Sequence, residues 1–295
     1  VAKMSRDWQH AAAADIVGEG EVTVRPEDMP CYRGSGSTGV VHGPPLSQDW
    51  ETSPPREVWR HPCGGGYAQV VVVGPYAVTI EQRDEREAVV CYDAASGAER
   101  WSHAWEAHFQ EVQGGPGPRA TPTIHDGAVY ALGAEGDLVK LSLRDGQVAW
   151  ERNILEDHQA PNTEWGVTSS PLIWQDLVIV NPGGAQGDGL AAYRQSDGEL
   201  VWNRPGVRAY AEGSGGQNRP GYSTPIVAML AGVEQIVCFD GTGLRGYLPA
   251  DGALLWEHEH KNFAGVNVAI PLVLEGDRIF ISTSYSVGSE MLRIS

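Results

Sequence analysis

One short pattern recurs four times along this chain: a glycine followed four residues later by a tryptophan. The pairs are Gly97–Trp101, Gly146–Trp150, Gly198–Trp202 and Gly252–Trp256. The intervals between successive tryptophans are 49, 52 and 54 residues. Each glycine follows Ser or Asp, and such dipeptides favour tight hairpin turns that need positive φ. A period of about fifty residues therefore indicates a repeat architecture in which each unit ends with a strand, a turn and a strand.

The segments before each turn also recur. Strands are predicted at 76–80, 128–132, 177–180 and 234–239, and again at 89–92, 138–141, 190–193 and 244–247. A proline opens each further unit, at Pro122, Pro171, Pro225 and Pro271. Proline is tolerated at the first residue of a strand, so it marks the innermost strand. Because a four-stranded sheet cannot bury both its faces alone, radial stacking of such sheets is predicted, which makes the fold an all-β propeller.

The repeat sets the predicted boundaries. We expect an extended lead-in at 1–50 that packs on the outside of the propeller, and a propeller domain at 51–295. Its blades are predicted near 63–105, 118–154, 165–205 and 221–260, with a partial blade at 266–295, which makes about five blades' worth. Residues 57–61 resemble an outermost strand that either has no blade before it or completes the partial blade. The acidic run at 81–87 is predicted to be a solvated hairpin tip.

Composition limits the classes of partner. The formal net charge is −17, so the chain lacks the Lys and Arg clusters that nucleic acids and anionic membrane surfaces require. No segment is long and apolar enough to predict a membrane span. The cysteines Cys31, Cys63, Cys91 and Cys238 form no C-x-x-C pair, so no zinc or thioredoxin-like motif is predicted. Their disulfide state stays open at this point.

The segment 92–101 resembles the tryptophan-docking repeat of pyrroloquinoline quinone (PQQ) propellers, and so do the shorter versions that end at the other tryptophans. The resemblance covers residues 50–295 and is closest to BamB-like, uncharacterised bacterial envelope members of that family. It implies seven or eight blades in all, so this chain would be an incomplete arc. It also implies a periplasmic or membrane-anchored location in the cell envelope. Structural docking is expected of Trp59, Trp101, Trp150, Trp202 and Trp256.

A quinone-dependent dehydrogenase of this family would need more than the fold. The resemblance implies a calcium ion held by carboxylate and amide oxygens, an aspartate base, and a disulfide between adjacent cysteines. This sequence has no adjacent cysteines, and no Glu, Asn and Asp set can be matched to those positions. We therefore predict no catalytic residue, no metal site and no cofactor, with PQQ and calcium as the alternative.

The axial channel is the default ligand site of such a fold. The residues just before each innermost strand should line its mouth, namely Tyr67, Gln69, Arg119, Thr121, Trp165, Ser169, Tyr222, Ser223 and Asn267. The guanidinium of Arg119 could clamp a carboxylate, or it could pair with a nearby acid or backbone carbonyls. His258 and His260 share one face of a strand, but we interpret them as surface residues. His103 and His108 are predicted to lie in loops.

The leading hypothesis is a non-catalytic propeller that acts as a protein-interaction or scaffold module of the bacterial cell envelope, with a protein partner on a propeller face. The alternative is a PQQ-dependent dehydrogenase of alcohols or sugars. A third class is a small-molecule or glycan-binding propeller without turnover, which would use Tyr67, Arg119, Trp165 and Tyr222.

Overall fold

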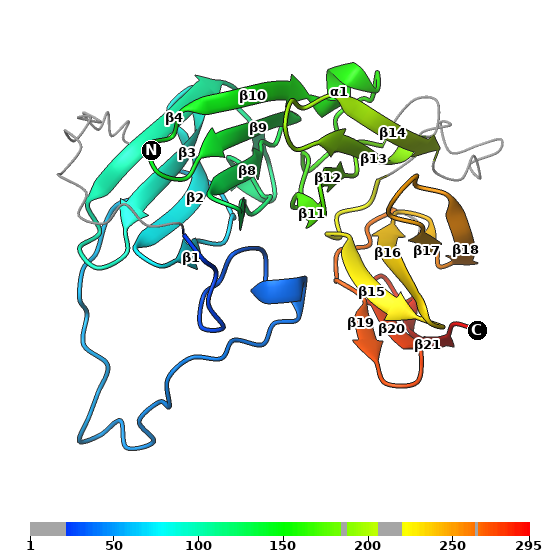
Figure 1. Ribbon diagram of the computed structural model, residues 1–295, viewed down its shortest axis with the longest axis horizontal. Coiled ribbons are helices and arrows are strands. Elements are labelled where there is room, and N and C mark those ends of the chain that lie inside the picture. Colours follow the sequence, from blue (N-terminus) through cyan, green and yellow to red (C-terminus); the bar gives the residue numbers. More distant parts are fainter. Residues whose placement is uncertain (1–21, 184–187, 206–219, 263–264) are drawn as a thin grey trace.

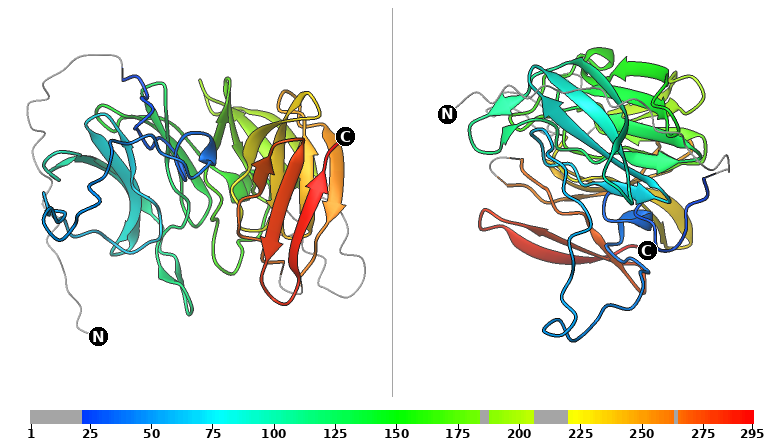
Figure 2. Two further views of the ribbon diagram at one scale, coloured as in Figure 1. Left: turned by 90° about the horizontal axis from the view of Figure 1, so that it is seen from below. Right: turned by 90° about the vertical axis from the view of Figure 1, so that its left-hand side faces the viewer.

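The computed structural model describes residues 22–183, 188–205, 220–262 and 265–295. Five antiparallel sheets, here called blades 1 to 5, follow one another around an open arc (Figure 1). The all-β propeller prediction is confirmed. In the views of Figure 2, blade 5 lies at one end of the arc and blade 1 at the other.

Blades 1 to 4 have four strands each, and they pair in chain order from the inner to the outer side of the arc. Blade 1 comprises β1 (Val71–Val73), β2 (Tyr76–Arg83), β3 (Arg86–Asp93) and β4 (Glu99–Glu106). Blade 2 comprises β7 (Thr123–His125), β8 (Ala128–Leu132), β9 (Asp137–Ser142) and β10 (Val148–Asn153). Blade 3 comprises β11 (Leu172–Trp174), β12 (Leu177–Val180), β13 (Asp188–Arg194) and β14 (Leu200–Pro205). Blade 4 comprises β15 (Ile226–Leu230), β16 (Val233–Asp240), β17 (Gly243–Tyr247) and β18 (Leu254–Glu259).

Blade 5 has three described strands, and the remaining elements are short. Its strands are β19 (Leu272–Leu274), β20 (Arg278–Thr283) and β21 (Gly288–Arg293). A small hairpin of β5 (Gln110–Glu111) and β6 (Gly115–Pro116) follows blade 1, and α1 (Ile154–Asp157) follows blade 2. Each repeat proline stands immediately before the innermost strand of its blade, because its missing N–H costs nothing at a strand start.

The repeated tryptophans lie on the turns of the following blades. Trp150 of blade 2 packs on Gly198, where an added methyl group would stand 2.7 Å from the ring. Its Nε1–H donates to the carbonyl of Gln195, three residues before that glycine, at 2.9 Å. Equivalent pairs join Trp59 to Gly97, Trp101 to Gly146 and Trp202 to Gly252, each with a bond to the carbonyl three residues before the glycine. Trp256 differs, because its Nε1–H donates to Gln235 of its own blade.

The contacts of Trp59 show where residues 57–61 lie. Its ring rests on the last turn of blade 1 and its Nε1–H donates to Ala94 at 3.0 Å. Residues 57–61 thus pack on blade 1, and the described three-stranded sheet of blade 5 does not include them.

Residues 28–37 of the lead-in lie on the inner side of the arc, so the prediction of an outside position is wrong for this part. Met29 bridges Val72 of β1 through two backbone hydrogen bonds of 2.8 and 2.9 Å. The N–H of Ile124 in β7 donates to the carbonyl of Pro30 at 2.7 Å. The 3₁₀ turn η1 (Ser35–Ser37) then contacts β15 (Figure 1). Innermost strands present unpaired N–H and C=O groups, and the lead-in satisfies some of them. Residues 1–21 of the predicted lead-in lie outside the described part.

A row of hydroxyl groups links the inner ends of neighbouring blades. The N–H of Gln69 donates to Thr121 Oγ1 at 3.0 Å, and the N–H of Thr121 donates to Ser170 Oγ at 2.9 Å. The N–H of Ser170 in turn donates to Thr224 Oγ1 at 3.0 Å. We call these three bonds the hydroxyl ladder. They explain why Ser or Thr precedes the proline in three repeats, because no other small side chain supplies an acceptor there.

The acidic run at 81–87 is only partly solvated, which corrects the sequence prediction. Glu81 is buried and pairs with Arg83 at 2.6 Å. Glu87 is fully buried, and the N–H of Ala134 in the next blade lies 3.1 and 3.2 Å from its two carboxyl oxygens. Burial raises the pKa of Glu87 to about 8, against the smaller lowering effect of the Ala134 bond.

Replacement of the docked glycine should destabilise the chain. Gly198→Ala introduces left-handed strain of about 1–2 kcal/mol at φ 70° and a clash with Trp150 that adds about 1–3 kcal/mol. Gly232→Ala is the matched control, since Gly232 has φ 74° and open space around it. Urea unfolding should give a clearly larger loss for Gly198→Ala, and equal losses would show that the tryptophan contact is unimportant.

Removal of one hydroxyl of the ladder should also lower stability. Thr121→Val keeps the shape of the side chain but leaves the N–H of Gln69 without its acceptor, at a cost of about 1–3 kcal/mol. Thr121→Ser keeps the hydroxyl and serves as the control. Equal melting temperatures of the Val and Ser variants in thermal unfolding would contradict a stabilising role of the hydroxyl ladder.

The stability of the chain should fall with rising pH on account of Glu87. Its pKa is raised in the folded state, so the folded chain holds this proton more tightly than the unfolded chain does. The favourable contribution is complete below about pH 4.5 and is lost as the pH rises toward about 8. Glu87→Gln removes this dependence, and its advantage over wild type in urea unfolding should grow across that range. Glu51→Gln, at an exposed site, should leave the pH profile unchanged.

Candidate functional site

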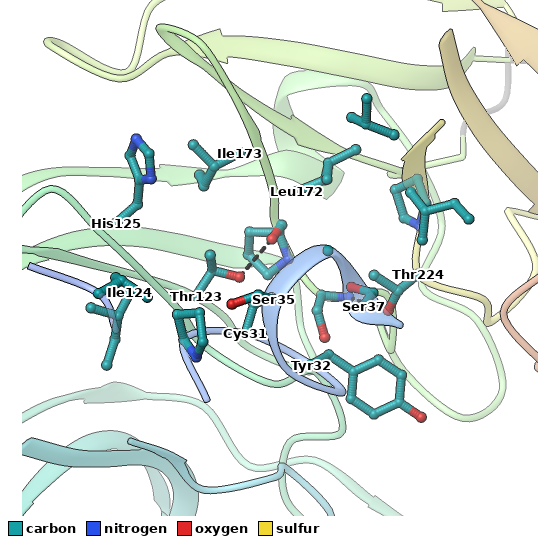
Figure 3. Close-up of a pocket in the computed structure, with 18 residues that line it drawn as sticks. Cys31, Tyr32, Ser35, Ser37, Thr123, Ile124, His125, Leu172, Ile173 and Thr224 are labelled. Atoms are coloured by element: carbon teal, nitrogen blue, oxygen red, sulfur yellow. Dashed lines mark hydrogen bonds between the residues drawn. The ribbon is translucent and has the colours of Figure 1, made fainter. Parts of the chain in front are cut away.

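Two cavities lie on either side of the lead-in, and Tyr32, Ser170 and Thr224 line both. The first, of about 330 Å³, lies between η1 and the starts of the inner strands. Figure 3 shows Ser35 and Ser37 of the lead-in facing this cavity across from Thr123 and Leu172. The hydroxyl of Thr123 is already used, since it donates to the carbonyl of Pro171 at 2.7 Å.

The second cavity, of about 360 Å³, is here called the aromatic cavity. It is lined by Tyr32, Tyr67, Trp165, Tyr222, Tyr285, Gln113, Arg119, Thr168, Ser170, Thr224, Val266 and Val268. Four of the nine predicted channel residues are brought together here, namely Tyr67, Arg119, Trp165 and Tyr222. The volume falls within the range of small-molecule sites.

The aromatic rings of this cavity are held by their backbones. The N–H of Tyr67 donates to the carbonyl of Pro118 at 2.8 Å, and the N–H of Tyr222 donates to the carbonyl of Asn267 at 2.9 Å. Trp165 packs edge-on against Tyr222, with ring centroids 5.4 Å apart and an interplanar angle of 72°. Tyr67, Trp165 and Tyr222 each come from the loop before an inner strand, and each loop is anchored by neighbouring backbone, so these three rings are positioned in advance.

Arg119 lies in this cavity, but its own neighbours engage its guanidinium. Nη1 donates to the carbonyl of Gly117, and Nη2 donates to the carbonyl of Gly115 at 2.9 Å. Nη2 also lies 3.5 Å from Glu111. Burial lowers the pKa of Arg119. This arrangement matches the alternative in which Arg119 pairs with an acid and with carbonyls, and it leaves no clamp for an incoming carboxylate.

The other five predicted channel residues do not line the aromatic cavity. Gln69 accepts a bond from the N–H of Arg33 in the lead-in at 3.1 Å, and Thr121 belongs to the hydroxyl ladder. Ser169 is buried, and Ser223 is buried and donates to the carbonyl of Ala269 at 3.1 Å. Asn267 is fully buried and donates to the carbonyl of Asp240 at 2.7 Å. Their side chains are buried or hydrogen-bonded where neighbouring strands and blades meet.

Eight of the twelve lining residues were not predicted from the sequence, and three of these eight come from segments other than the loops before the inner strands. Tyr32 belongs to the lead-in, which was predicted to lie outside. Gln113 comes from the hairpin of β5 and β6, and Tyr285 from the turn between β20 and β21. Tyr32 and Gln113 stand outside the repeat, and Tyr285 lies in a hairpin turn of blade 5, so the periodic signal of the inner strands did not point to them.

The histidines also differ from the prediction. His260 is buried, because β21 of blade 5 covers it, and both His258 and His260 lie 2.6 Å from Glu290 on that strand. These two bonds lower the pKa of Glu290. His103 lies within β4, not in a loop, and contacts Glu151 at 3.0 Å. In the described ranges, no group of three or more His, Cys, Asp or Glu side chains is arranged to hold a metal ion.

The cysteines are all free thiols. Cys91 and Cys238 are buried, Cys63 is exposed and Cys31 lies between these extremes. Burial raises the pKa of Cys91 to about 12, which makes it an unreactive core residue.

The described residues do not fit a PQQ and calcium pair at the aromatic cavity. The lining residues among them include no carboxylate for a calcium ion, and the one guanidinium is engaged by Gly115, Gly117 and Glu111.

No helix in the described part has the length and apolarity to cross a membrane.

Comparison with known proteins gives one family and several more distant likenesses. A protein-family model described as "Outer membrane protein assembly factor BamB" matches residues 47–214 and 86–293. A 1-butanol dehydrogenase (cytochrome c) of Thauera butanivorans is 33% identical over 84 residues, which are 28% of this chain and 12% of that protein.

Two solved structures resemble the fold. A europium-containing methanol dehydrogenase has a TM-score of 0.63 at 14% identity, over 87% of this chain and 55% of that one. A quinohemoprotein alcohol dehydrogenase of Comamonas testosteroni has a TM-score of 0.59 at 14% identity, over 90% of this chain and 45% of that one. The chain thus spans about half the length of these structures, and at such identities the likeness concerns the fold alone. The match of the family model to most of the sequence shows that this chain belongs to the PQQ-repeat propeller family of the outer membrane protein assembly factor BamB.

Proposed function

We propose that this chain is a non-catalytic interaction module of the bacterial cell envelope that binds a protein partner along the outer rim of its blades. The observation that carries the proposal is a repeated row of exposed aliphatic side chains on β10, β14 and β18. Each of these strands is the last of its sheet, so within the described residues its outward edge has no neighbouring strand. The row, here called the rim row, comprises Val148, Leu200, Val201, Leu254 and Leu255, which are 40–49% exposed.

Exposure of such an apolar row to water is unfavourable. Exposed aliphatic groups on an unpaired strand edge favour pairing with another chain. Exposed carboxylates stand beside the row, including Asp145, Glu151, Asp251 and Glu257. A partner that offers apolar side chains among basic ones would match both features. The envelope location follows from the description of the family and is part of this proposal.

The inner side of the arc supports a non-catalytic role. The lead-in covers inner strands β1 and β7, and the hydroxyls of the ladder already hold neighbouring blades. The guanidinium of Arg119 is likewise engaged. The groups that a catalytic centre would need at this end of the fold instead stabilise the chain itself.

A second candidate is a PQQ-dependent dehydrogenase, and the similarity to the butanol dehydrogenase favours it. That similarity covers 28% of this chain, and the lining of the aromatic cavity does not supply the calcium ligands. We therefore rank the interaction module first.

The test is site-specific photocrosslinking in the native host. A photoreactive phenylalanine analogue at Leu200, in the centre of the rim row, should give one discrete protein adduct in the envelope fraction. The same analogue at Val112, which is fully exposed on the hairpin of β5 and β6, is the control and should give none. Leu200→Glu together with Leu254→Glu should abolish the adduct from a probe at Val148 without lowering the melting temperature.

Absence of an adduct from Leu200, or equal adducts from both positions, would contradict the rim as a docking surface. Micromolar binding of PQQ in the presence of calcium, measured by calorimetry, would instead favour the second candidate.

A further inference from the structure

The aromatic cavity presents an unusual combination of ring surfaces and polar tips. Five of its lining residues are aromatic, and two of them are strongly exposed, with Tyr67 65% and Tyr285 44% exposed. Tyrosine and tryptophan pair an apolar ring with a hydrogen-bonding tip, which suits ligands that are apolar on one face and hydroxylated at the edges. Pyranose rings have this character, because their C–H groups form apolar faces and their hydroxyls project outward.

Several polar tips at this cavity have no partner of their own. The Tyr32 and Tyr67 hydroxyls, the Trp165 Nε1–H and the Gln113 carboxamide make no hydrogen bond within the ranges that the structure describes. A ligand with many hydroxyl groups can satisfy donors and acceptors of both kinds. A purely apolar ligand would shield these tips from water without replacing their bonds.

The charges at the cavity favour a neutral ligand. Its described lining includes no carboxylate that would pair with a cation. Its one cation, Arg119, is held by two carbonyls and lies 3.5 Å from Glu111, so it is not available to an anion. The net charge of −17 also disfavours the approach of anions. Burial of an unpaired charge is costly, and this excludes strongly charged ligands of either sign.

The geometry is prepared before binding. The backbones of Tyr67 and Tyr222 are bonded to neighbouring loops, and Trp165 is fixed edge-on against Tyr222. Arg119 stacks over Tyr67 with its guanidinium 5.4 Å from the ring centre, which holds that ring in place. Such preorganisation lowers the entropy cost of binding.

We propose that the aromatic cavity binds sugar residues of a neutral oligosaccharide, without turnover, with Trp165 and Tyr67 as stacking surfaces and Gln113 as a hydrogen-bonding group. This site is separate from the rim row, because its lining comes from the loops before the inner strands, from the lead-in and from the hairpin of β5 and β6. Either proposal can therefore fail while the other stands.

The experiment is a calorimetric titration of the chain with three soluble probes. They are cellopentaose, the β-1,4-linked pentamer of N-acetylglucosamine, and the pentamer of galacturonic acid as an anionic counterpart. We expect saturable binding of at least one neutral pentamer, a change in tryptophan fluorescence, and no binding of the anionic pentamer. Trp165→Ala should weaken binding by about tenfold or more, the equivalent of about 1.4 kcal/mol.

Matched variants separate stacking from folding. Trp50→Ala removes an exposed tryptophan of the lead-in that does not line the cavity, and it should leave binding unchanged. Tyr67→Phe keeps the ring and should retain most of the affinity that Tyr67→Ala loses, at equal melting temperatures. The proposal is overturned if neither neutral pentamer binds, if the anionic pentamer binds better, or if Trp165→Ala binds as wild type does.

Discussion

The structure depends on the contact between a tryptophan ring and the glycine of the next blade. Strands pair only within their own sheet, so the ladders of main-chain hydrogen bonds do not join one blade to the next. The ring of Trp150 buries apolar area on the order of 200 Å² against its neighbour. Its Nε1–H also meets the carbonyl three residues before the glycine. The same contact at the three junctions of blades 1 to 4 fixes the spacing of the outer strands, and the positive φ of the turn places the glycine under the ring.

The hydroxyl ladder fixes the inner side in the same way. Tryptophan contacts act near the outer strands, and the bonds of Thr121, Ser170 and Thr224 act where the inner strands begin. Two rows of links at different radii hold blades 1 to 4 against rotation relative to one another. This is why the loops before the inner strands can carry aromatic side chains at fixed positions, although the loops themselves have little regular structure.

The repeat could be predicted from the sequence because periodicity reports burial that recurs at each junction. The strands at 128–132 and 177–180 are predicted to the residue, and Tyr67, Arg119, Trp165 and Tyr222 do meet at one cavity. Glu87 could not be predicted to be buried, because its partner Ala134 lies 47 residues away in the next blade. His260 is covered by blade 5 for a similar reason. A side chain that looks solvated along its own strand can be closed in by a neighbour that the local pattern does not reveal.

The lead-in is the clearest case, and it bears most on function. It follows no repeat, so only its composition was informative, and an extended segment with Pro44-Pro45 and Pro54-Pro55 was expected to pack outside. The inner strands have unpaired backbone N–H and C=O groups. Hydrogen bonds to these groups stabilise the inner position of the segment more than hydration stabilises an outside position. Its position puts Tyr32 between two cavities and covers β1 and β7. The inner side of this chain is thus shaped by a segment outside the repeat, and fold similarity to dehydrogenases at 14% identity does not transfer their activity.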